Sequence, residues 1–172
     1  MKKIIVDKPG KVIKSKKELE KNLGVKLSIT GKEVSIKGTP EEEYYTEKMV
    51  DALSFGFPIE LVLLIKEEDY AFEILNIKDF TKRKDFERIR GRIIGTNGKA
   101  LRVLNELTKC TFAVQDNKVG IIGDPEYIKN GEDSVISIIR GARHANVYSY
   151  LEKHHNQPIV DLGLKEKTKS KS

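Results

Sequence analysis

The chain has 172 residues, enough for one medium domain or two small ones, and its charged fraction of 34% with a net charge of +6 admits a polyanionic partner. The single cysteine, Cys110, excludes an internal disulfide and a cysteine-rich zinc site, and we expect it to be a small buried hydrophobe. The most apolar run, residues 59–65, is too short to span a bilayer, and no N-terminal segment has the form of a signal peptide. We therefore expect a cytoplasmic protein without membrane contact.

The sequence repeats itself with an offset of 85 residues. The matches that need no gap include Val34, Ile36, Gly38, Pro40 and Glu41 with Val119, Ile121, Gly123, Pro125 and Glu126, Gly56 with Gly141, and Leu19 with Leu104. A repeat of this length predicts two related domains. We place them at residues 1–68 and 69–155, followed by a mobile basic tail at 156–172.

The first copy begins with a strand at residues 2–6, and a short connection leads to a helix near 15–23. Two short strands at 26–30 and 34–37 form a hairpin around Gly31. A helix over 40–55 follows, because Thr39, Pro40 and Glu41 are the residues that favour a helix start. A further helix within 57–68, starting at Pro58, is expected to join the two domains.

The second copy has a strand at residues 71–77, a basic helix at about 85–92, a glycine loop, and a third helix that runs to about residue 109. A hairpin of strands at 111–115 and 119–122 follows, and a single long helix is expected over 125–152. The order strand, helix, helix, strand, strand, helix predicts an α+β fold in which each domain is a three-stranded sheet backed by helices.

The glycine loop consists of Gly95, Thr96, Asn97 and Gly98, between two predicted helices. Glycine allows a tight turn with no Cβ in the way, and the next helix directs its N-terminal N–H groups and positive dipole end at the loop. Such a site binds anions, and Lys99 adds a full charge beside it. We expect the approach to be lined by Arg88, Arg92 and Arg102. Residues 82–102 hold eight basic and two acidic side chains, so the excess charge is local.

Two kinds of phosphate-binding loop compete for this segment. A nucleotide-triphosphate loop needs glycine five residues before Gly98 and a hydroxyl residue after Lys99, but the chain has Ile93 and Ala100 there. Residues 91–99 instead resemble the signature of the KH domain, whose Gly-x-x-Gly loop clamps about four nucleotides of single-stranded RNA. The element order matches the type I arrangement, βααββα. In a KH domain Ile94 would belong to the core or to the floor of the apolar groove that holds the bases. Candidates for the walls of that groove are Val103, Thr111 and Ala113.

With its two KH-like units, the linker Asp69-Tyr70 and the segment at 140–151, the chain resembles over about residues 1–155 the "partner of Nob" family of ribosome-assembly factors, whose archaeal members are tandem KH proteins. The resemblance implies binding to the 3′ region of small-subunit (16S) rRNA and its precursor, help to a PIN-domain endonuclease, and contact with other assembly or initiation factors. The alternative is a general KH RNA-binding adaptor, associated with the exosome or with transcription, that has no rRNA specificity.

The first copy lacks the loop. At the repeat offset Gly10 matches Gly95, but Ile13 stands in place of Gly98; alternatively residues 10–13 match 91–94 and the loop is deleted. Both alignments predict a degenerate KH-like unit that serves as a scaffold or a protein-docking surface. The histidines His144, His154 and His155 lack carboxylate or cysteine partners at metal-site spacing, so we expect no metal, no cofactor and no enzymatic activity.

Overall fold

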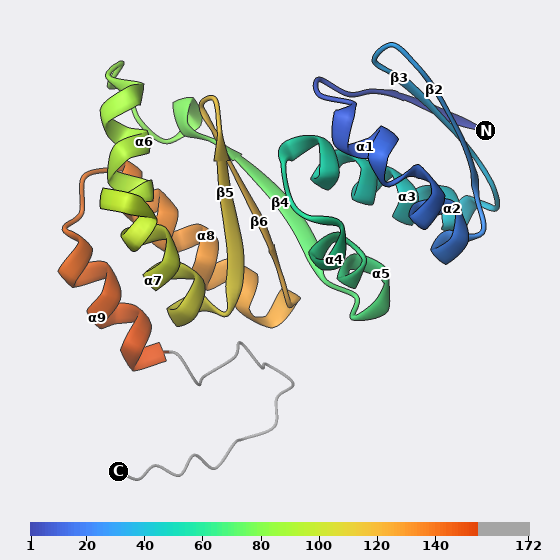
Figure 1. The fold of residues 1–172 in the computed structure, drawn as a ribbon. Helices are drawn as coiled ribbons and strands as arrows, with labels where there is room; N and C mark the ends of the chain where they lie inside the picture. Colours follow the sequence, from blue (N-terminus) through green and yellow to red (C-terminus); the bar gives the residue numbers. More distant parts are fainter. Residues whose placement is uncertain (155–172) are drawn as a thin grey trace, which may run out of the picture.

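The computed structural model describes residues 1–154 and contains two three-stranded antiparallel sheets with helices (Figure 1). The predicted tail at 156–172 and His155 lie outside the described residues. The first sheet has the order β1-β3-β2 and the second the order β4-β6-β5. We call the part from β1 to α5 the N-terminal half and the part from β4 to α9 the C-terminal half.

The N-terminal half consists of three strands and five helices, in chain order β1 (Lys2–Ile5), α1 (Gly10–Lys14), α2 (Lys16–Leu23), β2 (Lys26–Thr30), β3 (Glu33–Lys37), α3 (Pro40–Phe55), α4 (Ile59–Val62) and α5 (Leu64–Glu67). Helix α1 was not predicted, because five residues with one buried side chain, Val12, are too few to show a helical period. The joining helix is divided at Leu63, although Leu63 keeps helical φ and ψ of −61° and −24°.

The C-terminal half consists of three strands, four α-helices and two short 3₁₀ helices, in chain order β4 (Ala71–Asn76), η1 (Ile77–Asp79), α6 (Phe86–Ile94), η2 (Thr96–Gly98), α7 (Lys99–Thr108), β5 (Cys110–Gln115), β6 (Lys118–Gly123), α8 (Pro125–Ile139) and α9 (His144–His154). The prediction of one helix over 125–152 is wrong. Gly141 has φ of +103°, which ends α8, and the amide of Ala142 donates back to the carbonyl of Ser137 at 2.9 Å. Val147 and Leu151 on α9 are buried in the same core as the apolar residues of α8. The apolar residues therefore keep a helical spacing in the sequence across the break.

The two halves have similar helix caps and side-chain to backbone hydrogen bonds at equivalent positions. Thr39 and Asp124 both cap the helix that follows the hairpin, each with Pro at the first helical position. The amide of Leu27 donates to Glu20 at 2.8 Å, and 85 residues later the amide of Phe112 donates to Asn105 at 3.0 Å. Each helix before the hairpin therefore supplies a polar side chain to the edge strand of its sheet, at the repeat offset found in the sequence.

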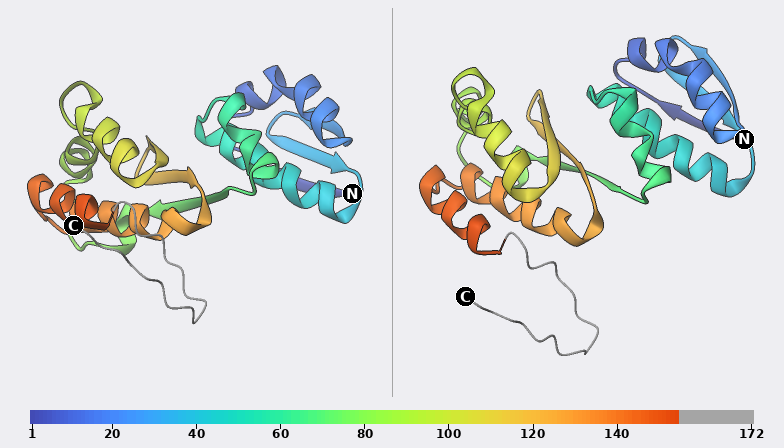
Figure 2. Two further views of the ribbon diagram at one scale, coloured as in Figure 1. Left: turned by 90° about the horizontal axis from the view of Figure 1, so that it is seen from below. Right: turned by 60° about the horizontal axis from the view of Figure 1, so that its bottom comes forward.

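The halves meet at the face of the second sheet that α6, α7 and α8 leave free, and both views of Figure 2 show α3–α5 beside β4. Phe72 and Ile122 point from that face into the core of the N-terminal half. A Cβ on Gly120 of β6 would lie 2.8 Å from the ring of Phe55 and 3.0 Å from that of Phe57. The glycine lets these two rings pack against the strand, so the halves share buried apolar surface.

The carboxyl of Asp51 on α3 faces a cavity of about 130 Å³ at this junction, which Asp7, Asp116 and Lys118 also line. Burial, and then the neighbouring Glu47, raise the pKa of Asp51 from its ordinary 3.8 to about 6, and Lys48 opposes them. Between these two values the folded protein binds a proton that the unfolded chain has released, so stability falls as the pH rises through this window.

Asp51→Asn is therefore expected to raise the free energy of unfolding by about 1 kcal/mol at neutral pH, a value reduced for partial solvent exposure. Near pH 4 the substitution is expected to change little, because the carboxyl is protonated in the folded protein. Urea unfolding at both pH values measures the difference. An equal gain in unfolding free energy at the two pH values would show that the gain does not come from removing the ionised Asp51 carboxylate of the folded protein.

Cys110 lies in the core of the C-terminal half, as expected, and is 3% exposed. Burial raises the pKa of its thiol to about 11. The thiolate is the reactive form, so we expect Cys110 to react with a thiol reagent only as fast as the protein unfolds. Labelling in the native buffer and in denaturant checks this. Rapid labelling of the native protein would mean that this core opens locally.

Candidate nucleic-acid interface

The loop between α6 and α7 turns the chain through a series of left-handed residues. Gly95, Asn97 and Gly98 have φ of +79°, +54° and +75°. The amide of Gly95 donates to the carbonyl of Gly91 at 2.8 Å and ends α6, and the amide of Gly98 donates to Gly95 at 3.2 Å. Asparagine tolerates the left-handed region better than most residues, so three of the four loop residues suit the backbone that they adopt.

The two glycines act differently. A Cβ on Gly95 would lie 2.6 Å from both the Cβ and the backbone nitrogen of Ala100, which cannot move without shifting α7. Gly98 is open: its nearest neighbour would be a terminal nitrogen of Arg102 at 3.4 Å. Gly95 therefore allows the loop to pack on α7, whereas Gly98 sets the left-handed turn and leaves backbone accessible.

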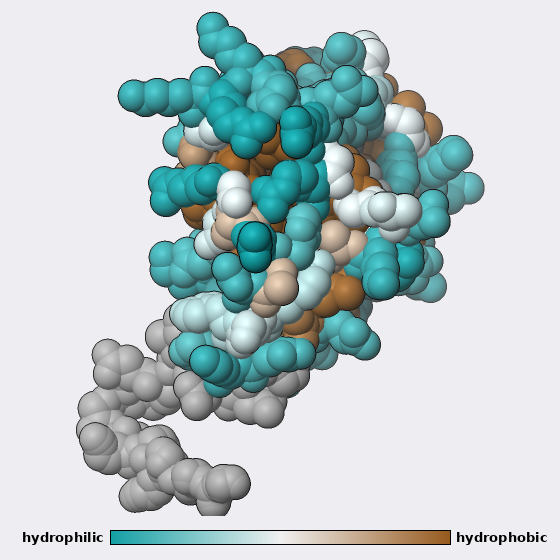
Figure 3. Space-filling view, turned by 90° about the vertical axis from the view of Figure 1, so that its left-hand side faces the viewer, coloured by the Kyte–Doolittle hydropathy of each residue, from teal (hydrophilic) through white to brown (hydrophobic). Residues whose placement is uncertain are grey.

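Positive charge surrounds the loop at the N-terminus of α7. Arg102 donates through Nη1 to the carbonyl of Asn97 at 2.9 Å, which fixes the loop against the helix. Lys99 and Arg102 are exposed and line an open hollow of about 680 Å³ on α7, together with Val103, Asn105 and Glu106. The helix dipole adds positive potential at the same end, so an anionic backbone can lie here. Figure 3 shows the side of the molecule that lies on the left in Figure 1, and hydrophilic side chains cover most of its upper part.

The structure separates the predicted arginines. Arg88 is exposed on α6, whereas Arg92 is half-buried. The guanidinium of Arg92 donates to the carbonyl of Ile138 at the end of α8 at 2.6 Å and to that of Ala142, in the connection to α9, at 2.5 Å. Its own carbonyl is 2.6 Å from Nε2 of His144. No local signal distinguishes Arg92 from Arg88, since its partners lie 46 and 50 residues further along the chain.

The apolar residues beside the loop also divide. Ile93 is fully buried in the core, and Ile94 is half-buried at the end of α6. Val103 lines the hollow on α7, and Thr111 is half-buried on β5. Ala113 packs instead against the core of the N-terminal half, because its side chain lies on the face of the sheet where the halves meet. The groove beside the loop therefore draws its apolar surface from α7 rather than from Ala113.

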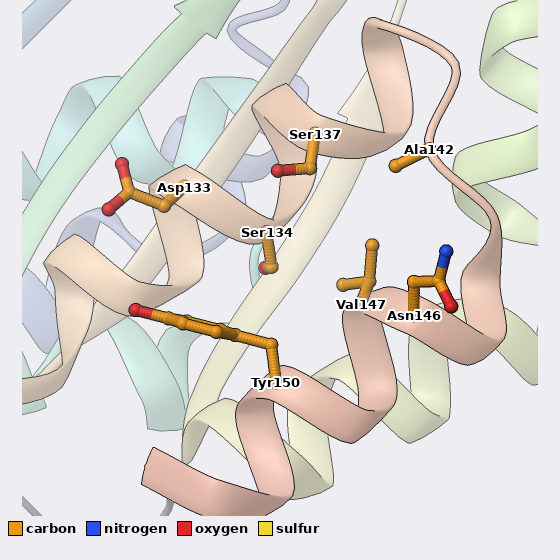
Figure 4. Close-up of a pocket in the computed structure, with 7 residues that line it drawn as sticks. All are labelled: Asp133, Ser134, Ser137, Ala142, Asn146, Val147 and Tyr150. Atoms are coloured by element: carbon orange, nitrogen blue, oxygen red, sulfur yellow. The ribbon is translucent and has the colours of Figure 1, made fainter.

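The other candidate features of the described residues lie outside the loop. Within residues 1–154 no group of three or more His, Cys, Asp or Glu side chains could hold a metal ion, and no helix is long and apolar enough to cross a membrane. His154 stacks on Tyr150. A cavity of about 300 Å³ opens between α8 and α9; the ring of Tyr150 extends toward the part of α8 that carries Asp133, and Ser137 lies nearer Ala142 (Figure 4). It lies on helices that do not carry the loop.

Residues 71–156 match the family model of the second KH domain of PNO1, described as a eukaryotic-type KH domain, type I. A KH domain-containing protein of Methanocaldococcus jannaschii is 32% identical over 90% of this chain and 70% of its own length. The chain belongs to the PNO1 family. The matched residues include the loop at 95–98 with the helices on both sides of it, which identifies the loop as the Gly-x-x-Gly loop of a KH domain.

Two further relatives have names that refer to ribosomal RNA. The pre-rRNA-processing protein pno1 of Emericella nidulans is 30% identical over 62% of this chain and 43% of its own length. A chain in the crystal structure of an a/eIF2α–aDim2p–rRNA complex from Pyrococcus horikoshii superimposes with a TM-score of 0.81 at 29% identity, over 90% of this chain and 93% of that one. This PNO1-family chain spans less than half the length of the fungal relative.

Proposed function

We propose that this protein binds single-stranded RNA through the loop at residues 95–98, with Lys99, Arg102 and Arg88 facing the phosphates. The observation that carries the proposal is the loop itself: two left-handed glycines around an exposed Thr96-Asn97 pair, at the N-terminus of a helix and beside an open hollow. Backbone N–H groups and exposed cations suit phosphates, and the half-buried Ile94 and Val103 suit the faces of bases. Arg92 is not part of this proposed contact.

The RNA that we propose is the 3′ region of small-subunit rRNA and its precursor. Support comes from relatives: one is named a pre-rRNA-processing protein, and a chain of similar fold occurs in a complex with rRNA. The loop reads backbone rather than base identity, so specificity for this sequence would come from the groove beside it. A general KH adaptor would share the loop and lack the base preference.

We further propose that the N-terminal half is a KH-like unit whose loop has been deleted. Support comes from its sheet order, which is the same as in the C-terminal half, and from α1, which runs into α2 across the single residue Ser15. Val12 on α1 and Ile93 on α6 are both fully buried, as expected if residues 10–13 correspond to 91–94. In this proposal the protein holds the RNA by the C-terminal half and presents it to a PIN-domain endonuclease that docks elsewhere, alongside other assembly or initiation factors.

The test is binding of labelled oligonucleotides that carry the 3′-terminal sequence of small-subunit rRNA, compared with scrambled oligonucleotides of the same length and composition. We expect the native sequence to bind at least about tenfold more tightly at physiological salt. Equal affinity for both would favour the general adaptor. For the endonuclease, the rate of cleavage of a precursor by the purified nuclease is measured with and without this protein, and an unchanged rate would contradict the proposed assistance.

A further inference from the structure

A second basic surface lies on the N-terminal half, away from the loop. Residues 8–17 contain five lysines and no acidic residue. Three of the lysines, Lys8, Lys11 and Lys14, are exposed and line one cavity of about 380 Å³, and we call these three the lysine cluster. They are spaced by three residues on and just before α1, which places them on one side of that helix.

The cluster is positioned and accessible. Lys11 donates through Nζ to the carbonyl of Gly56 at 2.7 Å, and the amide of Lys8 donates to the hydroxyl of Ser54 at 3.3 Å. These bonds hold the segment on the end of α3. A Cβ on Gly10 or Gly56, which both line the cavity, would have no neighbour within 4 Å, so a ligand can approach the backbone there. The side-chain ion pairs of the described residues do not include Lys8, Lys11 or Lys14.

The cavity borders the C-terminal half at the end of its edge strand. Gln115, the last residue of β5, lines it together with the three lysines. Strand β5 follows α7 through the single residue Lys109 and is held against that helix by the bond from the Phe112 amide to Asn105. Arg90, in the middle of α6, donates to the side chain of Asn117 in the turn after Gln115, so this turn lies between the helix that leads into the loop and the lysine cluster. In Figure 1, α6, the β5–β6 turn and α1 follow one another across the upper part of the molecule.

We propose that the lysine cluster is a second phosphate-contact site, where RNA held by the Gly-x-x-Gly loop continues past the end of β5 onto the N-terminal half. The inference rests on the proposed function and extends it, because the loop accommodates only about four nucleotides. RNA is favoured over an acidic protein because the cluster borders Gln115, and the turn after Gln115 is bonded to Arg90 on α6, the basic helix that leads into the loop. The N-terminal half then contributes non-specific affinity through counterion release.

The test compares two labelled single-stranded RNAs, one of about 5 nucleotides and one of about 15 that contains the shorter sequence. Lys8→Gln/Lys11→Gln/Lys14→Gln is expected to weaken the long RNA about 10- to 100-fold at 0.1 M salt and to lower its salt slope by about 2, since a single-stranded phosphate contact contributes about 0.7. Binding of the short RNA is expected to stay unchanged. Lys21→Gln/Lys26→Gln/Lys37→Gln, which removes three exposed lysines of the same half outside the cavity, is the charge-matched control.

The outcomes separate this inference from the proposed function. Equal weakening by the cluster variant and the control variant, or no weakening by either, overturns the inference and leaves the loop as the RNA site; the second result would direct attention to an acidic protein partner. Failure of the wild-type protein to bind either RNA overturns the proposed function instead. If loss of the Lys11–Gly56 bond unfolds the triple variant, Lys8→Gln/Lys14→Gln keeps that bond and is expected to weaken the long RNA about fivefold or more.

Discussion

Thr96→Asp/Asn97→Asp is expected to lower the affinity for single-stranded RNA about 100-fold or more. The substitutions place two carboxylates at the exposed tip of the loop, where the proposed phosphates lie, and like charges at a few ångströms repel by several kcal/mol near a protein surface. The fold is expected to survive, because both side chains are exposed and aspartate tolerates the left-handed backbone of residue 97. Fluorescence anisotropy with a labelled oligonucleotide measures the loss, and circular dichroism monitors the fold.

A control with the same residue types and the same charge change is available in the N-terminal half. Asn22 and Thr30 are both exposed, and Asn22→Asp/Thr30→Asp lowers the net charge by the same two units. It is expected to reduce affinity by no more than about threefold through long-range electrostatics. If the loop variant binds as well as this control, the loop serves only as a turn between helices, and the proposed RNA contact is wrong.

Phe57→Ala is expected to lower the free energy of unfolding by about 3–5 kcal/mol. Phe57 is 2% exposed, stacks on Phe55 with ring centroids 6.0 Å apart, and meets Phe72 of the second sheet edge-on at 5.9 Å. Truncation leaves a cavity where the two halves share their apolar surface, and the neighbouring strand cannot close over it without moving Gly120. Unfolding in urea, followed by circular dichroism, measures the loss.

Tyr44→Ala provides the aromatic control for this stability prediction. Tyr44 lies on α3, is 53% exposed, and contacts Tyr45 edge-on with ring centroids 5.5 Å apart. Its removal is expected to cost less than about 1 kcal/mol, the usual range for a surface substitution. A comparable loss for both variants would mean that the junction contributes no more than a surface contact, and that the halves are held together elsewhere.

Much of the C-terminal half could be predicted because its signals are local. The strands of the hairpin, the Asp124-Pro125 helix start and the glycine loop each depend on residues within a few positions of one another. The break at Gly141 also had a signal in the sequence, since the repeat pairs it with Gly56, which ends α3 with φ of +122°. Apolar residues on both sides of Gly141 kept helical spacing, and the period alone therefore predicted one helix where there are two.

The candidate site was predicted in part. The loop residues and Lys99 lie together, and Arg102 bonds to the loop, because all of them belong to one turn and the helix that follows. The side chain of Arg92 instead bonds to carbonyls of α8 and of the connection to α9, and Ala113 packs against the core of the N-terminal half. Neither outcome depends on a neighbouring residue in the chain, so neither had a signal in the local pattern.

The sequence by itself determined the repeated unit, the hairpins, the helix starts and the loop, because turns, caps and left-handed glycines are set by interactions that span a few residues. Only the tertiary structure decided which face of the second sheet is covered, how Arg92 is used, and that Gln115 lies beside the lysine cluster. These depend on how the two halves pack through Phe55, Phe57 and Phe72, and packing of that kind joins residues far apart in the chain by shape rather than by spacing.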